Sequence, residues 1–172
     1  MHLRRVNDAD VNEVFELRSN PDIMHFIPRP LAKDREDAME HIKKIDDKIN
    51  ENESINWGIT LKSESKLIGI LGFVRMTKDH FRAEVGYLLH PDQHRKGIIP
   101  EALKAVIEYG FREMKLHSIE AVVDPENKAS IRVLEKSNFI KEAHFKEKEF
   151  YKGKFNDTAV YSLLTNYSPG SI

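Results

Sequence analysis

The chain has 172 residues, which is enough for one ordinary domain with a core of its own. Charged residues make up 32% of it and the formal net charge is −1, so no overall basic field attracts nucleic acid or anionic lipid. Cysteine is absent, which excludes disulfide scaffolds, Cys-ligated metal sites and cysteine nucleophiles.

The first third of the sequence predicts a short strand and two helices. Residues 3–6 form the expected strand, and the cap-type residues 7–10 precede a helix, which Pro21 either ends or follows as the start of the next turn. The following segment, 22–31, contains two prolines and predicts an irregular connection. A second helix is expected to begin at Asp34, because apolar residues then recur at helical spacing.

The remaining two thirds predict strands that alternate with two helices. Strands are expected at 55–61, 66–76, 82–90 and 118–123, with two more at 142–151 and 158–164. The strongest amphipathic helix covers 99–115, and a shorter helix covers 129–136. No linker or repeat interrupts this order, so residues 1–172 are expected to form one mixed α/β domain.

The start of the chain becomes polar at once, and its apolar stretches are far shorter than the ~20 residues that span a bilayer. We therefore expect a cytoplasmic protein that has neither a membrane nor a nucleic acid as a partner.

A short basic loop precedes the strongest helix. The stretch from His90 to Leu103 joins an apolar strand to that helix through Arg95, Lys96 and Gly97. Unpaired N–H groups at a helix N-terminus, two basic side chains and a glycine that permits close approach are suited to phosphate groups. A capped helix with two solvated basic residues is the alternative. The glycine patterns of P-loop NTPases and of dinucleotide-binding folds are absent.

The loop and helix resemble motif A of the GNAT acyltransferase superfamily, Gln/Arg-x-x-Gly-x-Gly/Ala, with His94 at the first position and Ile99 at the last. Residues 124–139 resemble its motif B, with Asn138 where glycine is usual. The run 18–21, Arg-Ser-Asn-Pro, is similar to the Rim-type branch, which includes acetyltransferases of ribosomal-protein N-termini. The resemblance covers nearly the whole chain.

This resemblance implies a central, twisted, mixed β-sheet with helices on both faces, and transfer of an acetyl group from acetyl-CoA to a primary amine. The amine could belong to a protein N-terminus, a polyamine or a small molecule. The resemblance also implies a homodimer, and we expect no metal. The expected cofactor-binding residues are Leu88, Leu89, His90, Arg95, Lys96, Gly97, Ile98, Ile99, Asn127 and Ser130.

Two side chains are candidates for proton transfer. Glu84, at the start of a strand, matches the position where the family often has a base; a glutamate in a partly apolar cleft is suited to that task. The alternative is an edge carboxylate that pairs with Arg82 or Arg75. Ser130 matches a serine placed near the thioester sulfur, where it would act as the acid. Its alternative role is an ordinary serine at a helix N-terminus.

A tyrosine that many GNAT enzymes have in motif B is absent here, because Leu134 stands at its position. Tyr87 is a weaker alternative as the acid. The missing tyrosine and Ile99 also favour a second hypothesis, a non-catalytic acyl-CoA-binding or regulatory module on the same fold. The absence of cysteine favours direct attack of the amine on the thioester, although Ser130 keeps an acyl-serine route open.

Overall fold

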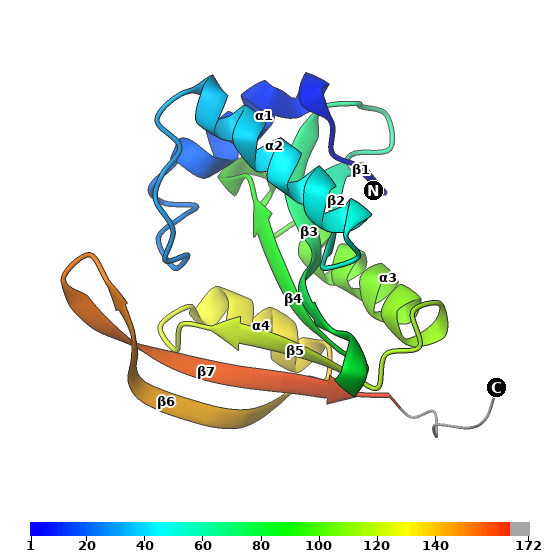
Figure 1. The fold of residues 1–172 in the computed structure, drawn as a ribbon, viewed down its shortest axis with the longest axis vertical. Helices are drawn as coiled ribbons and strands as arrows, with labels where there is room; N and C mark the ends of the chain where they lie inside the picture. Colours follow the sequence, from blue (N-terminus) through cyan, green and yellow to red (C-terminus); the bar gives the residue numbers. More distant parts are fainter. Residues whose placement is uncertain (166–172) are drawn as a thin grey trace. The chain divides into compact units, whose positions relative to one another are not determined.

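The computed structural model describes residues 1–165, which divide into two compact units. Unit 1 contains residues 1–74 and 86–102, and unit 2 contains residues 75–85 together with the chain from 103 onward. Seven strands are hydrogen-bonded in the order β1-β2-β3-β4-β5-β7-β6 (Figure 1), and β3 and β4 contribute residues to both units. The predicted α/β architecture with a mixed sheet is confirmed.

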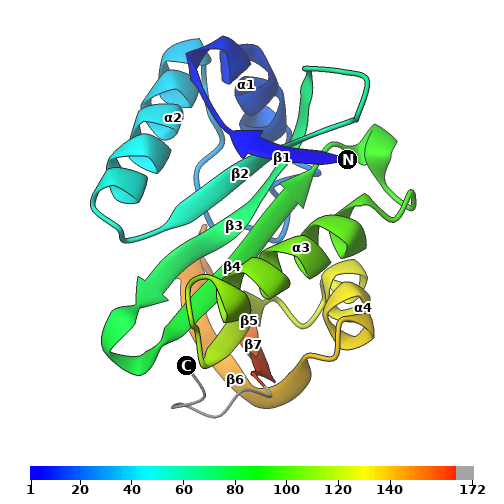
Figure 2. The same cartoon turned by 90° about the vertical axis from the view of Figure 1, so that its right-hand side faces the viewer.

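Unit 1 is built on an antiparallel ladder of β1 (His2–Arg5), β2 (Ile55–Thr60) and β3 (Leu67–Thr77). The helices α1 (Val11–Ser19) and α2 (Arg35–Asn50) pack side by side (Figure 2). Asp34 caps α2 by accepting a hydrogen bond from the amide of Asp37, as the sequence predicts. The apolar faces of these elements form one core of buried residues: Val6, Val14, Leu17, Ala38, Ile42, Ile45, Leu67 and Ile70.

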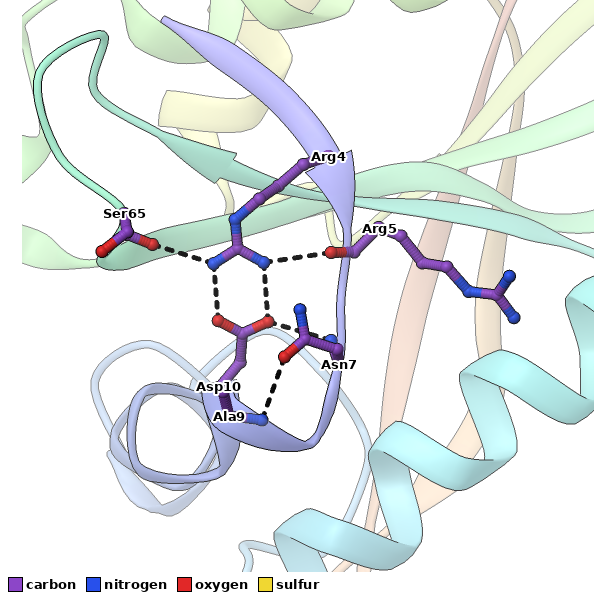
Figure 3. A network of polar contacts seen from close by, with 6 residues as sticks. All are labelled: Arg4, Arg5, Asn7, Ala9, Asp10 and Ser65. Carbon is purple, nitrogen blue, oxygen red and sulfur yellow. Dashed lines mark hydrogen bonds and ion pairs between the residues drawn. The ribbon is translucent and has the colours of Figure 1, made fainter.

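A partly buried ion pair holds the beginning of the chain in place (Figure 3). The guanidinium of Arg4 donates to both carboxylate oxygens of Asp10, at 2.8 and 2.6 Å, and also to the carbonyls of Arg5 and Ser65. Asp10 lies in the 3-10 helix Asp8–Asp10 and accepts the amide of Asn7, whose side chain in turn accepts the amide of Ala9. The pair therefore connects β1, the entry to α1 and the turn after β2.

Unit 2 contains the beginning of the fourth strand and the last three strands in the order given above. The first residues of β4 (Arg82–Leu89) pair in parallel with β5 (Ser118–Val123) over three positions, 82–84 against 118–120. Next to β5 runs the antiparallel hairpin of β7 (Lys154–Leu164) and β6 (Ile140–Tyr151). The helix α4 (Lys128–Lys136) lies against β5, and the hairpin turn extends beyond both (Figure 1). The helix α3 (Ile98–Arg112) belongs to both units.

The last strand begins four residues earlier than the pattern predicts, at Lys154 instead of 158. Lys152 and Gly153, with φ of 50° and 77°, form a two-residue turn in which both residues are left-handed. This geometry matches the twist of a tight hairpin, so the polar residues after it already belong to β7. The left-handed conformation expected of Asn138 is present, with φ of 65°.

Among the helices of residues 1–165, none has the length and apolar character needed to cross a membrane.

Candidate functional site

The basic loop between β4 and α3 is held in shape by hydrogen bonds among its own residues and by one to β3. The amide of His90 donates to the carbonyl of Ile68 on β3, at 2.8 Å. The 3-10 helix Pro91–Gln93 then turns the chain, and the amide of His94 donates to the carbonyl of Pro91 at 2.9 Å. The Nζ of Lys96 donates to the side-chain oxygen of Gln93 at 3.1 Å. The loop therefore has a defined conformation next to the end of β4.

Three consecutive amide groups are available at the start of α3. Within residues 1–165, the N–H groups of Gly97, Ile98 and Ile99 donate no hydrogen bond, and the next residue is Pro100, which has no N–H. The first amide in the helical pattern is that of Glu101, which donates to the carbonyl of Gly97 at 3.1 Å. Unpaired amides at the positive end of a 15-residue helix are the arrangement that binds phosphate oxygens.

The side chains around these amides fit a polyanion. Arg95, Lys96 and Gly97 are exposed, and Gly97 has a φ of 75°, a conformation that glycine adopts without strain. Ile98 and Ile99 are buried, with only 6% and 8% of their surface exposed. Ile99, at the position of the usual small residue, is therefore part of the interior, whereas residues 94–97 before it are on the surface.

The end of β4 approaches its neighbour closely in unit 1. A Cβ atom added to Gly69 of β3 would lie 2.6 Å from the carbonyl oxygen of Leu88 and 2.9 Å from the side chain of Leu89. Only glycine permits this approach, because real Cβ atoms are not found that close to backbone oxygen. Leu88, Leu89 and His90 thus lie in one unit with the basic loop, as the cofactor-site prediction requires.

Glu84 belongs to unit 2, where its carboxylate pairs with Arg75 of β3. Both Nε, at 3.0 Å, and a terminal nitrogen of Arg75 donate to Oε2 of Glu84. The hydrogen bonds to Glu84, followed by the charge of its carboxylate, raise the pKa of Arg75 above its usual value. The neighbouring Arg82 pairs instead with Glu120 at 3.6 Å and donates to Ser118. Of the two partners foreseen for Glu84, the structure selects Arg75.

The motif B residues in unit 2 form the start of α4. Asn127 is its N-cap, and its side-chain oxygen accepts the amide of Ser130 at 3.1 Å. Ser130 is therefore the third residue of the helix rather than its cap. Leu134, at the position of the usual tyrosine, is fully buried, with 0% of its surface exposed. It is a core residue, and its place in the fold offers no proton donor.

One contact in the loop was not foreseen from the sequence. The Nε2 atom of His94 lies 3.1 Å from the carbonyl oxygen of Leu89 and connects the loop back to the end of β4. A histidine five residues after a strand end is a weak signal by itself, because the contact depends on how the loop turns in between. The pattern of apolar residues does not predict that turn.

Comparisons with known proteins agree with this arrangement. A family model described as "Acetyltransferase (GNAT) domain" matches residues 1–140. The uncharacterized N-acetyltransferase YoaA of Bacillus subtilis (strain 168) is 33% identical over 162 residues, which cover 94% of this chain and 92% of the relative. At that identity and coverage the two chains share a family.

Solved structures show the same fold. The spermidine N-acetyltransferase of Vibrio cholerae, solved with CoA and spermine, has a TM-score of 0.84 and 23% identity over 95% of this chain and 94% of its own. A ribosomal L7/L12 α-N-protein acetyltransferase, solved with coenzyme A, has a TM-score of 0.86 and 19% identity over 94% and 92%. The resemblance to the Rim-type branch thus extends to the fold, and this chain belongs to the GNAT family of N-acetyltransferases.

Proposed function

We propose that the chain transfers the acetyl group of acetyl-CoA directly to a primary amine. The observation that carries the proposal is the row of unpaired amides at Gly97, Ile98 and Ile99, flanked by exposed Arg95 and Lys96. Main-chain donors and two positive charges match the pyrophosphate of a coenzyme A molecule. The net charge of the whole chain is only −1, so binding of a polyanion depends on this local group.

The chemistry needs one bond made, one broken and two proton movements. The amine nitrogen bonds to the thioester carbon, the C–S bond breaks, and the sulfur leaves as a thiolate. In the proposed roles, Glu84 accepts a proton from the ammonium, so that a neutral amine attacks. As the C–S bond breaks, Ser130 donates its hydroxyl proton to the departing sulfur and takes up the second proton that the nitrogen loses. Main-chain groups at Leu88 and Leu89 are proposed to orient the thioester and its developing oxyanion. Asn127 is proposed to contact the pantetheine arm in addition to capping α4.

A primary amine is the class of acceptor that we propose, with polyamines as the first group to test. A relative named spermidine N(1)-acetyltransferase, from Vibrio cholerae, is 22% identical over 166 residues. Peptides with a free N-terminus and small aminated molecules complete the test panel. Release of free CoA thiol in the presence of each amine, followed by mass spectrometry of the product, identifies the acceptor.

Binding of the nucleotide part of CoA, which carries the phosphates, is tested with CoA and pantetheine. We expect CoA to bind measurably in titration calorimetry and pantetheine, which lacks the phosphates together with the adenosine, to bind about tenfold or more weakly. The double variant Arg95→Ala, Lys96→Ala should weaken CoA binding while leaving pantetheine binding unchanged. Lys43→Ala, which removes an exposed charge from α2, serves as the control. Absence of CoA binding at millimolar concentration would contradict the proposal.

The buried Leu134 favours one second candidate, a module that binds acyl-CoA without turnover. A GNAT fold without the motif B tyrosine can keep the phosphate-binding loop and lack a proton donor. Binding of acetyl-CoA with no thiol release across the whole amine panel would select this candidate over the transferase.

A further inference from the structure

His94 links the end of β4 to the phosphate-binding loop through a single side-chain hydrogen bond. Its Nε2 lies 3.1 Å from the carbonyl oxygen of Leu89. A carbonyl oxygen only accepts, so the proton of this bond belongs to Nε2. Both the neutral ring with its proton on Nε2 and the charged imidazolium provide that donor, which makes the bond independent of which of the two forms is present.

This hydrogen bond lies immediately before a turn of the loop backbone. Directly after His94 the chain enters a left-handed conformation at Arg95, with φ of 62°, and returns to a second one at Gly97. A non-glycine residue is disfavoured in that region, so a contact immediately before it helps to hold the chain there. The amides of Gly97, Ile98 and Ile99 follow this turn directly, and their direction depends on it.

Burial does not explain the presence of this ring. His94 is exposed, so its contribution comes from the hydrogen bond rather than from packing in the core. Replacement of an exposed residue leaves the fold largely intact, which makes the role measurable in folded protein.

We propose that His94 is a positioning residue, whose Nε2–H bond to the Leu89 carbonyl holds the loop in the conformation that presents the amides of Gly97 to Ile99 to a phosphate group. The inference rests on the proposed binding of acetyl-CoA by this loop. It adds a residue that acts through the main chain and whose side chain makes no contact with the reacting atoms.

Two amide side chains provide a matched pair of tests. In His94→Gln, the amide nitrogen takes the place of Nε2 and can still donate to Leu89. In His94→Asn, the amide nitrogen corresponds to Nδ1 and is too short to reach. His94→Leu preserves most of the volume and removes every donor. The dissociation constant of CoA is measured for each variant by calorimetry, with circular dichroism and thermal unfolding as checks on the fold.

We expect His94→Asn and His94→Leu to raise the dissociation constant of CoA about tenfold, while His94→Gln stays within about threefold of the parent chain. In steady-state assays the KM for acetyl-CoA should rise in the same two variants, with the KM for the amine unchanged. Equal losses in all three variants, or no loss in His94→Leu, would overturn the role of His94. Failure of the parent chain to bind CoA would instead overturn the proposed function itself, so the two failures are distinguishable.

Discussion

Arg75 of β3 and Glu84 of β4 form an ion pair in which two guanidinium nitrogens donate to the same carboxylate oxygen, Oε2. The carboxylate is mostly buried, with 15% of the side chain exposed, whereas the guanidinium is 69% exposed. The contact engages one oxygen of Glu84 and leaves Oε1 outside the pair. This arrangement is compatible with an oriented base and equally with a structural pair, and two variants separate these roles.

Glu84→Gln should lower kcat/KM by about 100-fold or more if the carboxylate accepts the proton of the amine, because general-base catalysis commonly contributes that much. The dissociation constant of CoA should remain unchanged, since Glu84 is not part of the loop proposed to bind the phosphates. Protonation of a catalytic base lowers kcat/KM at acidic pH. This decrease should be absent in Glu84→Gln. The pH dependence of kcat/KM for both proteins is the measurement.

Arg75→Gln is the matched variant, because it removes the cation and keeps the carboxylate. We expect it to retain turnover within about tenfold of the parent and to retain the acid-side fall of the rate. If both variants lose the same activity and Glu84→Gln keeps the acid-side fall, Glu84 has a structural role and the base is another group.

Variants of Asn127 and Ser130 distinguish an effect on stability from an effect on catalysis. Asn127→Ala removes the side-chain oxygen that accepts the amide of Ser130, so we expect a loss of about 1 kcal/mol of unfolding free energy. Ser130→Ala retains that amide and removes only the hydroxyl group. If the hydroxyl donates to the departing sulfur, kcat should fall about tenfold or more with much less effect on stability. Urea unfolding and steady-state rates of the two variants test this, and a parental kcat in Ser130→Ala would contradict it.

The place of the basic loop between a strand and a helix could be predicted from the sequence because its signals are local. Arg95, Lys96 and Gly97 adjoin one another, and the helix after them has a clear apolar periodicity. The ion pair of Glu84 was foreseen only as an alternative, because residues nine positions apart meet only once their two strands pair. Side-chain partners across strands depend on register, which short apolar patterns do not define.

Contacts that depend on backbone conformation could not be predicted. The bond from His94 to Leu89 requires the particular turn of the intervening loop, including the left-handed residue that follows. The early start of β7 at Lys154 was missed for a related reason, because a two-residue turn with both residues left-handed is signalled by Gly153 alone. A lysine in that conformation has no characteristic sequence signal.

From the Arg4–Asp10 ion pair we predict a contribution to the free energy of unfolding that is lost at acidic pH. Burial opposes ionisation of Asp10, but the hydrogen bonds from Arg4 and Asn7 and the charge of Arg4 outweigh it, so the pKa of Asp10 lies below 3.8. A lowered pKa stabilises the folded chain above the unfolded value and ceases to do so as pH falls through the folded value. Asp10→Asn should therefore cost about 2 kcal/mol near neutral pH, and this cost should shrink below pH ~4.

The control for this prediction is Asp47→Asn, which breaks an exposed pair with Lys43 on α2. It should leave the unfolding free energy nearly unchanged, because exposed pairs contribute little. Urea unfolding of the three proteins at pH 7 and pH 3 provides the comparison. A cost of Asp10→Asn that is as large at pH 3 as at pH 7 would show that the network stabilises through packing rather than through charge.

From the lowered pKa of His41 on α2 we predict a second pH range in which the free energy of unfolding changes. Burial, followed by the charges of Arg18 and Lys44, lowers the pKa of His41 from 6.5 to about 4. Between these two values the unfolded chain binds a proton that the folded chain does not, so stability must fall as pH decreases from about 6.5 toward 4. The contribution of this one group has a slope of at most ~1.4 kcal/mol per pH unit.

His41→Gln should remove this contribution, because the amide does not titrate. We expect the unfolding free energy of the parent chain to decrease from pH 7 to pH 5 more steeply than that of His41→Gln, with a difference between the two that grows as pH falls. His25→Gln is a matched control, since that ring is in contact with Phe26 and outside the α1–α2 core. Parallel curves for the parent and His41→Gln over this range would show that folding does not lower the pKa of His41.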